Sequence, residues 1–336
     1  MDFYKKELLQ LLDEFNSLKI AEQIDYKKFY LYSIITHSTA IEGSTVTEIE
    51  NQLLFDEGIN ATKRTMIEQL MNLDLKAAYE KSFEYAKNKT SVTVENLKVL
   101  SSLVMRNTGS VFNSISGTFD SRKGELRLVN VSAGMGGKSY MSFTKVPDKL
   151  ESFCTWLNNE RKNLGKDIYE DYKLSFLAHY NLVLIHPWVD GNGRMSRLLM
   201  NQIQSEADLL PSIVFSNHKD EYIASLSSSQ EEENPEKFLE FMFSELIEYL
   251  KTTISNYKKS IKADSLSFEI KNDPINDPIN ALLDLIKTDA SLNYTEYAEK
   301  LGKSEATVKR LIQKLKNEGK IERSGSNKTG FWKIVN

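Results

Sequence analysis

The chain of 336 residues is 40% hydrophobic and 27% charged, with only 6 Pro and 15 Gly, which excludes a collagen-like, low-complexity or disordered protein. No run approaches 18 uncharged apolar residues, and the N-terminal stretch MDFYKKELLQLLDEF has the pattern of an amphipathic helix, not of a signal peptide. We therefore expect a cytoplasmic globular protein without a membrane partner. Its single cysteine, Cys154, excludes an internal disulfide framework and is expected in the core.

Charge is distributed unevenly along the chain. The net charge is −4, but residues 281–336 hold 11 Lys and Arg against 7 Asp and Glu, whereas the preceding 280 residues hold 32 against 40. A basic end on an acidic body indicates two modules with different partners. The length leaves room for one large domain and one small domain.

Helical periodicity dominates the first part of the chain, to about residue 106, and predicts an N-terminal helical region over 1–100. The pattern breaks at 125–143, where two alternating stretches flank the turn SAGMGG and predict a β-hairpin. We therefore expect a mainly α fold, with a helical core over 101–264 that carries this one hairpin. Further helical patterns lie at 146–159, 168–184, 194–207, 219–228 and 235–254.

The glycine-rich stretch at 134–139 is a candidate phosphate loop. A P-loop needs Gly-x-x-x-x-Gly-Lys-Ser/Thr, and its first glycine would fall on Ser132. Such a loop also leads into a helix, whereas residues 140–143 continue an alternating strand pattern. We therefore interpret the stretch as the tip of the hairpin.

The segment 186–197, HPWVDGNGRMSR, combines a titratable imidazole, an acid, a Gly-Asn-Gly turn and two arginines. Gly191 and Gly193 leave backbone N–H groups accessible to an anion, and the helix that follows adds its unpaired first-turn N–H groups and its dipole. Arg194 and Arg197 are three residues apart, so both project from one face of that turn and can bind outer phosphates.

Two further side chains complete this candidate polyphosphate site. Asp190 offers a hard oxygen ligand to a divalent cation on those phosphates, and His186 can act as a base near neutral pH. Each residue alone is better explained by a capped helix with surface ion pairs, but their grouping within 12 residues favours the site. Zinc is disfavoured because His179 and His186 lack further ligands at a metal-binding spacing, and His179 is expected to be packed or at the solvent edge.

These residues resemble the signature of the Fic family, His-Pro-Phe-x-Asp/Glu-Gly-Asn-Gly-Arg-x-x-Arg, and depart from it only at Trp188, which replaces the usual Phe. The resemblance implies an all-α core with a β-hairpin flap, and a reaction that transfers AMP from ATP to a hydroxyl side chain of a protein. It implies His186 as the base, Asp190 as the Mg²⁺ ligand, and the phosphate-binding residues Gly191, Asn192, Gly193, Arg194 and Arg197.

The resemblance implies two further contacts. Tyr222 would border the adenine, and the hairpin at 125–143 would act as the flap, which docks a segment of the target protein by strand addition.

A second match lies far upstream, at residues 38–43, Ser-Thr-Ala-Ile-Glu-Gly. Ser38 and Glu42 are four residues apart on one helical face, and Gly43 is suited to end that helix. The stretch fits the family's inhibitory motif, Ser/Thr-x-x-x-Glu-Gly/Asn. The resemblance implies that Glu42 pairs with Arg197 and prevents productive seating of the γ-phosphate, so we expect an autoinhibited enzyme.

The basic end of the chain follows a linker. Residues 265–280 contain the repeat Asp-Pro-Ile-Asn, which predicts a linker. The pattern of residues 281–336 predicts three helices followed by a hairpin. This order resembles the winged helix-turn-helix family. In the third helix, 305–317, an apolar stripe faces inward, and we expect duplex DNA to contact Thr307, Lys309, Arg310 and, in the wing, Lys328.

Several alternatives remain open at this point. The chain could instead be a DNA-binding transcriptional regulator whose core only senses nucleotide, although such a sensor would not need His186. An enzyme could also work in reverse, with Glu42 positioning a water that removes AMP from a target. The winged helix could serve protein contact or dimerisation, and the sequence does not fix whether the chain forms a homo-oligomer.

Overall fold

The computed structural model describes residues 2–22, 26–133, 139–271, 278–317, 319–324 and 331–335. The chain divides into two compact units, Met1–Ile254 and Ser255–Asn336. Both consist mainly of helices, and each carries one small two-stranded antiparallel sheet among its described residues. The fold class is therefore mainly α, as expected. None of the described helices is long and apolar enough to cross a membrane.

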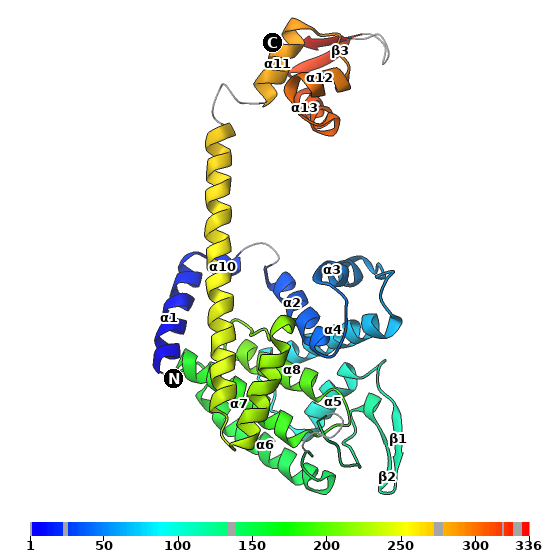
Figure 1. Ribbon diagram of the computed structural model, residues 1–336, viewed down its shortest axis with the longest axis vertical. Helices are drawn as coiled ribbons and strands as arrows, with labels where there is room; N and C mark the ends of the chain where they lie inside the picture. Colours follow the sequence, from blue (N-terminus) through cyan, green and yellow to red (C-terminus); the bar gives the residue numbers. More distant parts are fainter. Residues whose placement is uncertain are drawn as a thin grey trace. The chain divides into compact units, whose positions relative to one another are not determined.

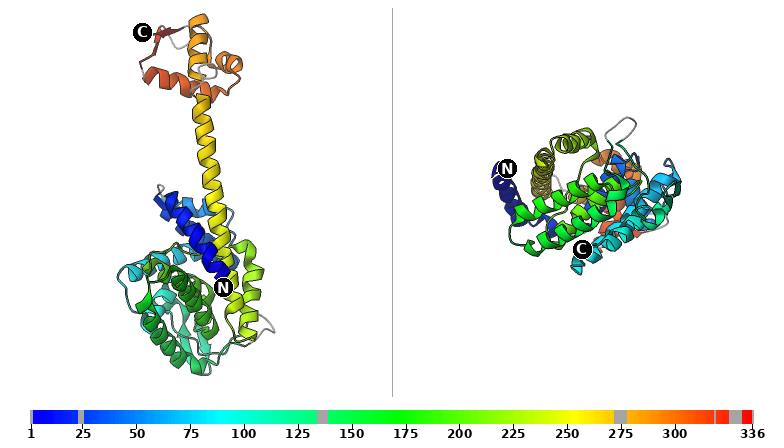
Figure 2. Two further views of the ribbon diagram at one scale, coloured as in Figure 1. Left: turned by 90° about the vertical axis from the view of Figure 1, so that its left-hand side faces the viewer. Right: turned by 90° about the horizontal axis from the view of Figure 1, so that it is seen from below.

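The first unit contains the helices and strands that surround the motif at 186–197 (Figure 1). The helices are α1 (Asp2–Ser17), α2 (Tyr26–Ile41), α3 (Glu48–Glu57), α4 (Met66–Lys87), α5 (Val94–Val104), α6 (Val146–Glu160), α7 (Ile168–Ile185), α8 (Asn192–Glu206), α9 (Lys219–Glu231) and the first part of α10 (Glu236–Lys271), which continues past the boundary at Ile254. The strands are β1 (Val111–Ser114) and β2 (Gly117–Asp120), which pair with Val111 opposite Asp120. The two views of Figure 2 show α1 on the outside of this unit.

Helix α8 lies at the centre of the first unit, between α7 and α4, although its sequence NGRMSRLLMNQIQSE is largely polar. Its residues are buried almost without a break. Two of its buried polar side chains are hydrogen-bonded to neighbouring helices: Asn201 Nδ2 donates to the Tyr79 hydroxyl at 3.1 Å, and Gln204 Nε2 donates to Ser175 Oγ at 2.9 Å. The first two turns of a central, packed helix therefore carry the two arginines of the motif.

The β-hairpin prediction is wrong in its position. Residues 125–143 contain no strand in their described part, only an isolated antiparallel bridge between Ser132 and Ser139, and the tip at 134–138 lies outside the described residues. The reversal of the chain is present, since the Tyr140 N–H donates to the Val131 carbonyl at 3.0 Å. The paired strands lie instead at 111–120, in a stretch for which no strand was predicted.

The linker prediction is also wrong at its N-terminal end. Helix α10 continues to Lys271, so residues 265–271 are helical. No Pro or Gly interrupts the sequence between Glu236 and Lys271, and nothing ends the helix before the Asp-Pro pair at 273–274. Residues 272–277 lie outside the described residues.

The second unit has the order of elements expected of a winged helix-turn-helix. It comprises α11 (Pro278–Thr288), α12 (Tyr294–Leu301), α13 (Glu305–Asn317), β3 (Ile321–Ser324) and β4 (Phe331–Ile334). Its small core is built around Leu282, Ile286, Tyr297, Val308, Ile312, Leu315 and Trp332. Ser304 caps α13, because its Oγ accepts from the Thr307 N–H at 3.3 Å.

Candidate active site

His186 ends α7 in the left-handed conformation, with φ 50° and ψ 61°. Pro187 disfavours helix at the residue before it, yet the His186 N–H still closes the last turn on the Leu182 carbonyl at 3.0 Å. The imidazole Nδ1 lies 3.3 Å from the Val183 carbonyl. Because a carbonyl can only accept, this contact favours the proton on Nδ1 and leaves Nε2 as the basic nitrogen.

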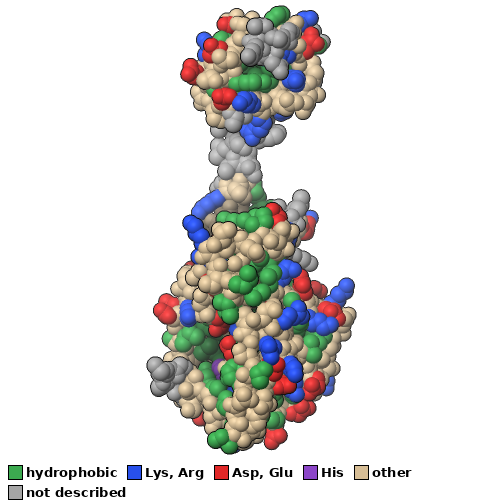
Figure 3. All heavy atoms as spheres, turned by 90° about the vertical axis from the view of Figure 1, so that its right-hand side faces the viewer, with side chains coloured by type: hydrophobic (Ala, Val, Ile, Leu, Met, Phe, Trp, Pro, Cys, Tyr) green, Lys and Arg blue, Asp and Glu red, His purple; other side chains and the backbone are tan. Residues whose placement is uncertain are grey.

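Burial lowers the pKa of His186 to about 4, so its imidazole is neutral at pH 7 and able to accept a proton. The side chain is half-buried. Figure 3 shows a histidine side chain within a hollow of the first unit, bordered by acidic and apolar side chains.

The turn after His186 is held by Trp188 and Asn192. Trp188 is fully buried, and its indole N–H donates to the Gly124 carbonyl at 3.0 Å, so the residue that replaces the usual Phe gains a hydrogen bond. Asn192 Oδ1 accepts from the Trp188 N–H at 3.1 Å, and Asn192 Nδ2 donates to the Trp188 carbonyl at 2.9 Å. The Asn192 side chain therefore shapes the turn, and the backbone N–H of Asn192 is the group left for the expected contact with phosphate.

Gly191 makes this turn sterically possible. Its φ is +79°, and a Cβ there would lie 2.8 Å from Met105 Sδ. The N–H groups of Asn192, Gly193 and Arg194, in the first turn of α8, have no intrahelical acceptor. Together with the helix dipole they form a site that favours an anion.

Asp190 stands beside this helix start and is the candidate metal ligand. Its side chain is 63% exposed, and its Oδ1 accepts from the Gly191 N–H at 2.6 Å. Within the part of the chain that the structure describes, no group of three His, Cys, Asp or Glu side chains could hold a metal ion. One exposed carboxylate fits a Mg²⁺ ion that takes its other ligands from phosphates and water, which is the usual way Mg²⁺ binds.

Arg197 is 2% exposed and hydrogen-bonded to the end of α2. Its Nε donates to Ser38 Oγ at 2.8 Å, and its Nη2 donates to the Ser38 carbonyl at 3.0 Å and to Glu42 Oε1 at 2.5 Å. The predicted contact between Glu42 and Arg197 is thus present. Burial alone would raise the pKa of Glu42, but the Arg197 guanidinium outweighs it and the net pKa is lowered, so the carboxylate is charged at neutral pH.

The Glu42 carboxylate also covers the start of α8. A Cβ on Gly193 would lie 2.7 Å from Glu42 Oε1 and 3.1 Å from Arg197 Nη1. The carboxylate therefore occupies the anion position that the helix N-terminus and Arg197 create together. The Glu42 side chain is 31% exposed and that of Arg197 only 3%, so Glu42 is the accessible member of the pair.

A buried polar network holds α2, the helix that precedes Glu42. Asn72 Oδ1 on α4 accepts from Thr39 Oγ1 on α2 at 2.8 Å and from Asn51 Nδ2 on α3 at 2.9 Å, and Asn72 Nδ2 donates to Ser44 Oγ at 3.1 Å. Asn72, Asn51 and Thr39 are fully buried. Buried polar groups must keep their partners, so this network fixes the register of α2 and with it the position of Glu42.

Arg194 does not take the outward position expected of a phosphate-binding residue. It is 2% exposed and packs against the end of α5, where its Nη1 donates to the Val104 carbonyl at 3.4 Å and its Nη2 lies 3.2 Å from Met105 Sδ. Its Nη2 is 3.7 Å from Asp190 Oδ1. The spacing of the two arginines predicted that both lie on one face of the helix. In the structure the end of α5 covers Arg194.

Tyr222 is likewise buried and not open to a nucleotide base. It is 1% exposed, its hydroxyl lies 2.8 Å from His179 Nε2, and Arg197 Nη1 donates to the same hydroxyl at 3.5 Å. The His179 ring stacks on Phe238 with 5.0 Å between centroids, and burial lowers its pKa well below the usual value. The Tyr222 hydroxyl therefore contacts Arg197 from the protein interior, and of the two positions expected for His179, packed or at the solvent edge, the structure has the packed one.

Residues 91–204, which contain this geometry from α5 to α8, match the Fic/DOC family model. This part of the chain is a Fic domain. Residues 277–322 match a second family model, described as winged helix-turn-helix DNA-binding.

Comparison with individual proteins supports the Fic fold over a longer stretch. The chain is 27% identical over 221 residues to the protein adenylyltransferase fic-1 of Caenorhabditis elegans, which covers 64% of this chain and 40% of the relative. It is 29% identical over 229 residues to the protein adenylyltransferase Fic of Aedes aegypti, with 68% of this chain and 42% of the relative covered. The chain thus spans about two fifths of the length of these curated relatives.

Solved structures share the fold at lower identity. A Fic domain-containing signaling protein from Bacteroides thetaiotaomicron superposes with a TM-score of 0.62 at 22% identity, over 75% of this chain and 97% of that one. Residues 134–508 of C. elegans Fic-1 superpose with a TM-score of 0.59 at 20% identity, over 77% and 74% of the two chains.

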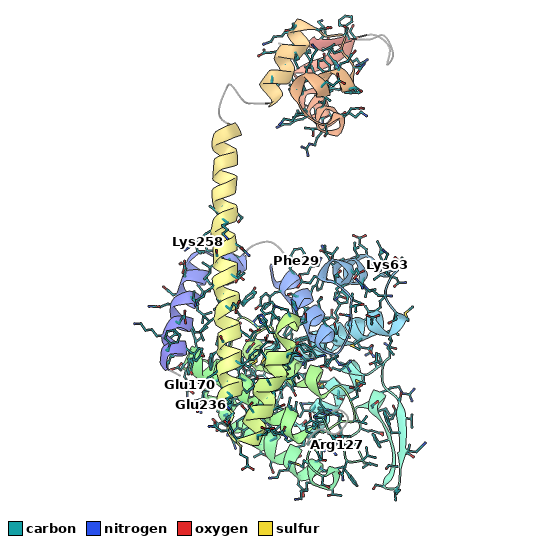
Figure 4. The ribbon with its side chains drawn as sticks, viewed as in Figure 1. Phe29, Lys63, Arg127, Glu170, Glu236 and Lys258 are labelled. Carbon is teal, nitrogen blue, oxygen red and sulfur yellow. The ribbon has the colours of Figure 1, made fainter. Side chains whose placement is uncertain are left out.

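Two residues of the Fic domain that touch His186 were missed by the sequence analysis. Arg127, labelled in Figure 4, is 1% exposed; its Nε donates to the His186 carbonyl at 2.7 Å, its Nη1 to the Val129 carbonyl at 2.7 Å and its Nη2 to the Met141 carbonyl. The Tyr140 ring stacks on the His186 imidazole. Within an alternating pattern both residues resembled the ordinary polar and aromatic positions of a strand, and no local signal marked them.

The candidate DNA-contacting residues lie on α13 where they are described. Lys309 and Arg310 are exposed, but Lys309 Nζ lies 2.6 Å from Glu305 Oε1. Thr307 is half-buried, and its hydroxyl lies 2.9 Å from Ser304 Oγ. Lys328 lies outside the described residues. Arg310 is therefore the candidate with the most accessible charge.

Proposed function

We propose that this chain is a protein adenylyltransferase that transfers AMP from ATP to a hydroxyl side chain of a target protein. The names of the curated relatives support this activity, and the arrangement around His186 supports the chemistry. A neutral imidazole with a free Nε2 stands a few residues before a helix N-terminus suited to phosphates. The observation that carries the proposal is this pairing of a base with an anion site.

The residues divide the reaction between them. The target hydroxyl oxygen forms a bond to the α-phosphorus, the bond from that phosphorus to the bridging oxygen breaks, and pyrophosphate leaves. His186 Nε2 takes the hydroxyl proton, and the N–H groups at the start of α8 stabilise charge on the phosphates. Asp190 would hold Mg²⁺, which would neutralise phosphate charge when bound.

Arg197 contributes to phosphate binding only when Glu42 leaves it. In the structure described above its guanidinium is occupied by Glu42 and Ser38. A carboxylate in the anion position repels a phosphate there and removes the cation that would bind it. We therefore propose that the resting enzyme is autoinhibited by Glu42, and that the segment 125–143 docks the target.

The test compares Glu42→Gly with the unaltered chain and with His186→Ala, using α-labelled ATP and a cell lysate. We expect Glu42→Gly to label protein and the unaltered chain to label little. Adding His186→Ala to Glu42→Gly should abolish the label, and an undiminished signal there would refute the role of the base. An unchanged rate in Glu42→Gly would refute autoinhibition.

The reverse activity, removal of AMP from a modified protein, is separated by the same variants. Glu42→Gly should lose the ability to release AMP from a labelled target if Glu42 positions the attacking water. Inhibition alone predicts that this variant releases AMP no more slowly than the unaltered chain.

A second function, binding of duplex DNA, is supported by the match of residues 277–322 to a winged helix-turn-helix DNA-binding model. The exposed basic residues of α13 support it as well. Binding of the full chain to duplex DNA that weakens steeply with salt would favour this function. Absence of binding at low salt would favour protein contact instead.

A further inference from the structure

The His186 imidazole is covered on one face by the ring of Tyr140. The two ring centroids are 3.6 Å apart and the ring planes differ by 15°, which is a close parallel stack. Tyr140 is half-buried. No other aromatic ring contacts the His186 ring among the described residues.

Tyr140 is fixed by the reversal of the chain at 125–143. Its N–H donates to the Val131 carbonyl at 3.0 Å, and the bridge between Ser132 and Ser139 precedes it directly. On its other side the Met141 carbonyl accepts from the buried Arg127 guanidinium. The backbone is therefore hydrogen-bonded at Tyr140 itself and at the residue after it, and these two bonds fix the position from which the ring projects.

The contacts on His186 come from separate directions. Tyr140 lies against the ring face, the Val183 carbonyl accepts at Nδ1, and Arg127 donates to the His186 carbonyl. The edge that carries Nε2 is left for the acceptor hydroxyl. These contacts restrict rotation of the imidazole about its side-chain bonds. General-base catalysis benefits from this restriction, because the base must keep a fixed orientation toward the hydroxyl.

We propose that Tyr140 is a positioning residue for His186: its ring holds the imidazole with Nε2 toward the acceptor hydroxyl. The proposal deepens the adenylyltransferase function and rests on it for its kinetic consequence. The aromatic face does the positioning, so phenylalanine should replace Tyr140 and alanine should not. The segment 125–143, which we propose docks the target, would then also align the base.

The kinetic test uses the full chain with Glu42→Gly, so that the rate is measurable. Adding Tyr140→Ala should lower kcat about tenfold to a hundredfold, the scale of a misaligned catalytic group, with the KM for ATP nearly unchanged. Adding Tyr140→Phe should retain the rate. Phe112→Ala, which removes a stacked ring from the β1–β2 hairpin, is the matched control and should also retain it.

A second readout does not depend on activity. With ¹³C-labelled histidine in the full chain, the His186 ring resonances, assigned through His186→Ala, should move when Tyr140→Ala removes the ring current. Its titration midpoint should rise from about 4 towards the ordinary value as the ring gains solvent. Arg127, Asp190 and Glu42 are the charged groups that act on this imidazole. The comparison is made between Glu42→Gly and Glu42→Gly with Tyr140→Ala, so Arg127 and Asp190 are present, and Glu42 is absent, in both proteins.

The outcomes separate this proposal from the proposed function. Unchanged kcat and unchanged His186 resonances in Tyr140→Ala would overturn the positioning role, as would an equal loss in Tyr140→Phe. If Glu42→Gly itself transfers no AMP, the adenylyltransferase function fails, and the histidine resonances still decide whether the Tyr140 ring lies against the imidazole and shields it from solvent.

Discussion

Asn72 offers a way to release Glu42 without touching the site. It lies on α4, is fully buried, and its side chain bonds to Thr39 within α2 and to Ser44 just after it, at 2.8 and 3.1 Å. Asn72→Ala removes both contacts, and also the bonds of Asn72 to Asn51 and to the Glu68 carbonyl, while Glu42 and Arg197 keep their chemistry. We therefore expect α2 to undock more often and the rate of AMP transfer to rise.

The size of the effect on docking follows from the two lost hydrogen bonds that join α4 to Thr39 and Ser44. Each contributes about 1 kcal/mol net, so docking of α2 weakens by about 2 kcal/mol. That is about a thirtyfold shift in the equilibrium between docked and undocked α2, and the rate should rise by up to this factor while the docked form predominates. The rate of Glu42→Gly sets the ceiling.

The assay measures incorporation of α-labelled AMP by Asn72→Ala, Glu42→Gly and the double variant, beside their thermal unfolding. The double variant should be no faster than Glu42→Gly, because both changes remove the same inhibition. Asn158→Ala is the control for general destabilisation, since the Asn158 side chain on α6 bonds to Val92 and Arg161 and not to α2. A rate for Asn72→Ala equal to that of the unaltered chain, or additive rates in the double variant, would refute the reasoning.

Three further outcomes follow from the structure. Because burial lowers the pKa of His186 to about 4, AMP transfer by Glu42→Gly should stay level from neutral pH down to about pH 5 and fall near pH 4; a fall centred near 6.5 would contradict a buried base. Trp188→Phe should lower the free energy of unfolding by about 1–2 kcal/mol in chemical denaturation, because the Gly124 carbonyl loses its indole donor, and should leave transfer active; equal stability would show that this bond contributes nothing. If the winged helix binds DNA, Arg310→Ala should reduce the salt slope of binding by about one, whereas Lys287→Ala on α11 should not, and equal slopes would exclude Arg310 from the contact.

The sequence predicted those features that depend on local chemistry. The segment 186–197 carries its base, turn and helix start within one stretch, so the end of α7 and the start of α8 were foreseeable. The contact between Glu42 and Arg197 was also anticipated, through the resemblance of 38–43 to an inhibitory motif. The three helices and the hairpin of the second unit were also predicted from the order of the sequence patterns over 281–336.

Features that depend on distant contacts were not predictable. The alternation at 125–131 resembled a strand, but Arg127 turns inward and bonds to the carbonyls of Val129, Met141 and His186, so those carbonyls have a partner outside any strand ladder. The burial of Arg194 depends on Met105, 89 residues away in sequence. Spacing along one helix could place these side chains on a face, but it could not show which other helix covers that face.

The central claim, that a base and an anion site transfer AMP under the control of Glu42, is tested most directly by the position of the label. Purified Glu42→Gly is incubated with ATP labelled either on the α- or on the γ-phosphate, with and without His186→Ala. Our account predicts protein labelled only by α-labelled ATP, in a His186-dependent manner, and at a far lower level in the unaltered chain. Label from the γ-phosphate, or α-label that persists without His186, would contradict it.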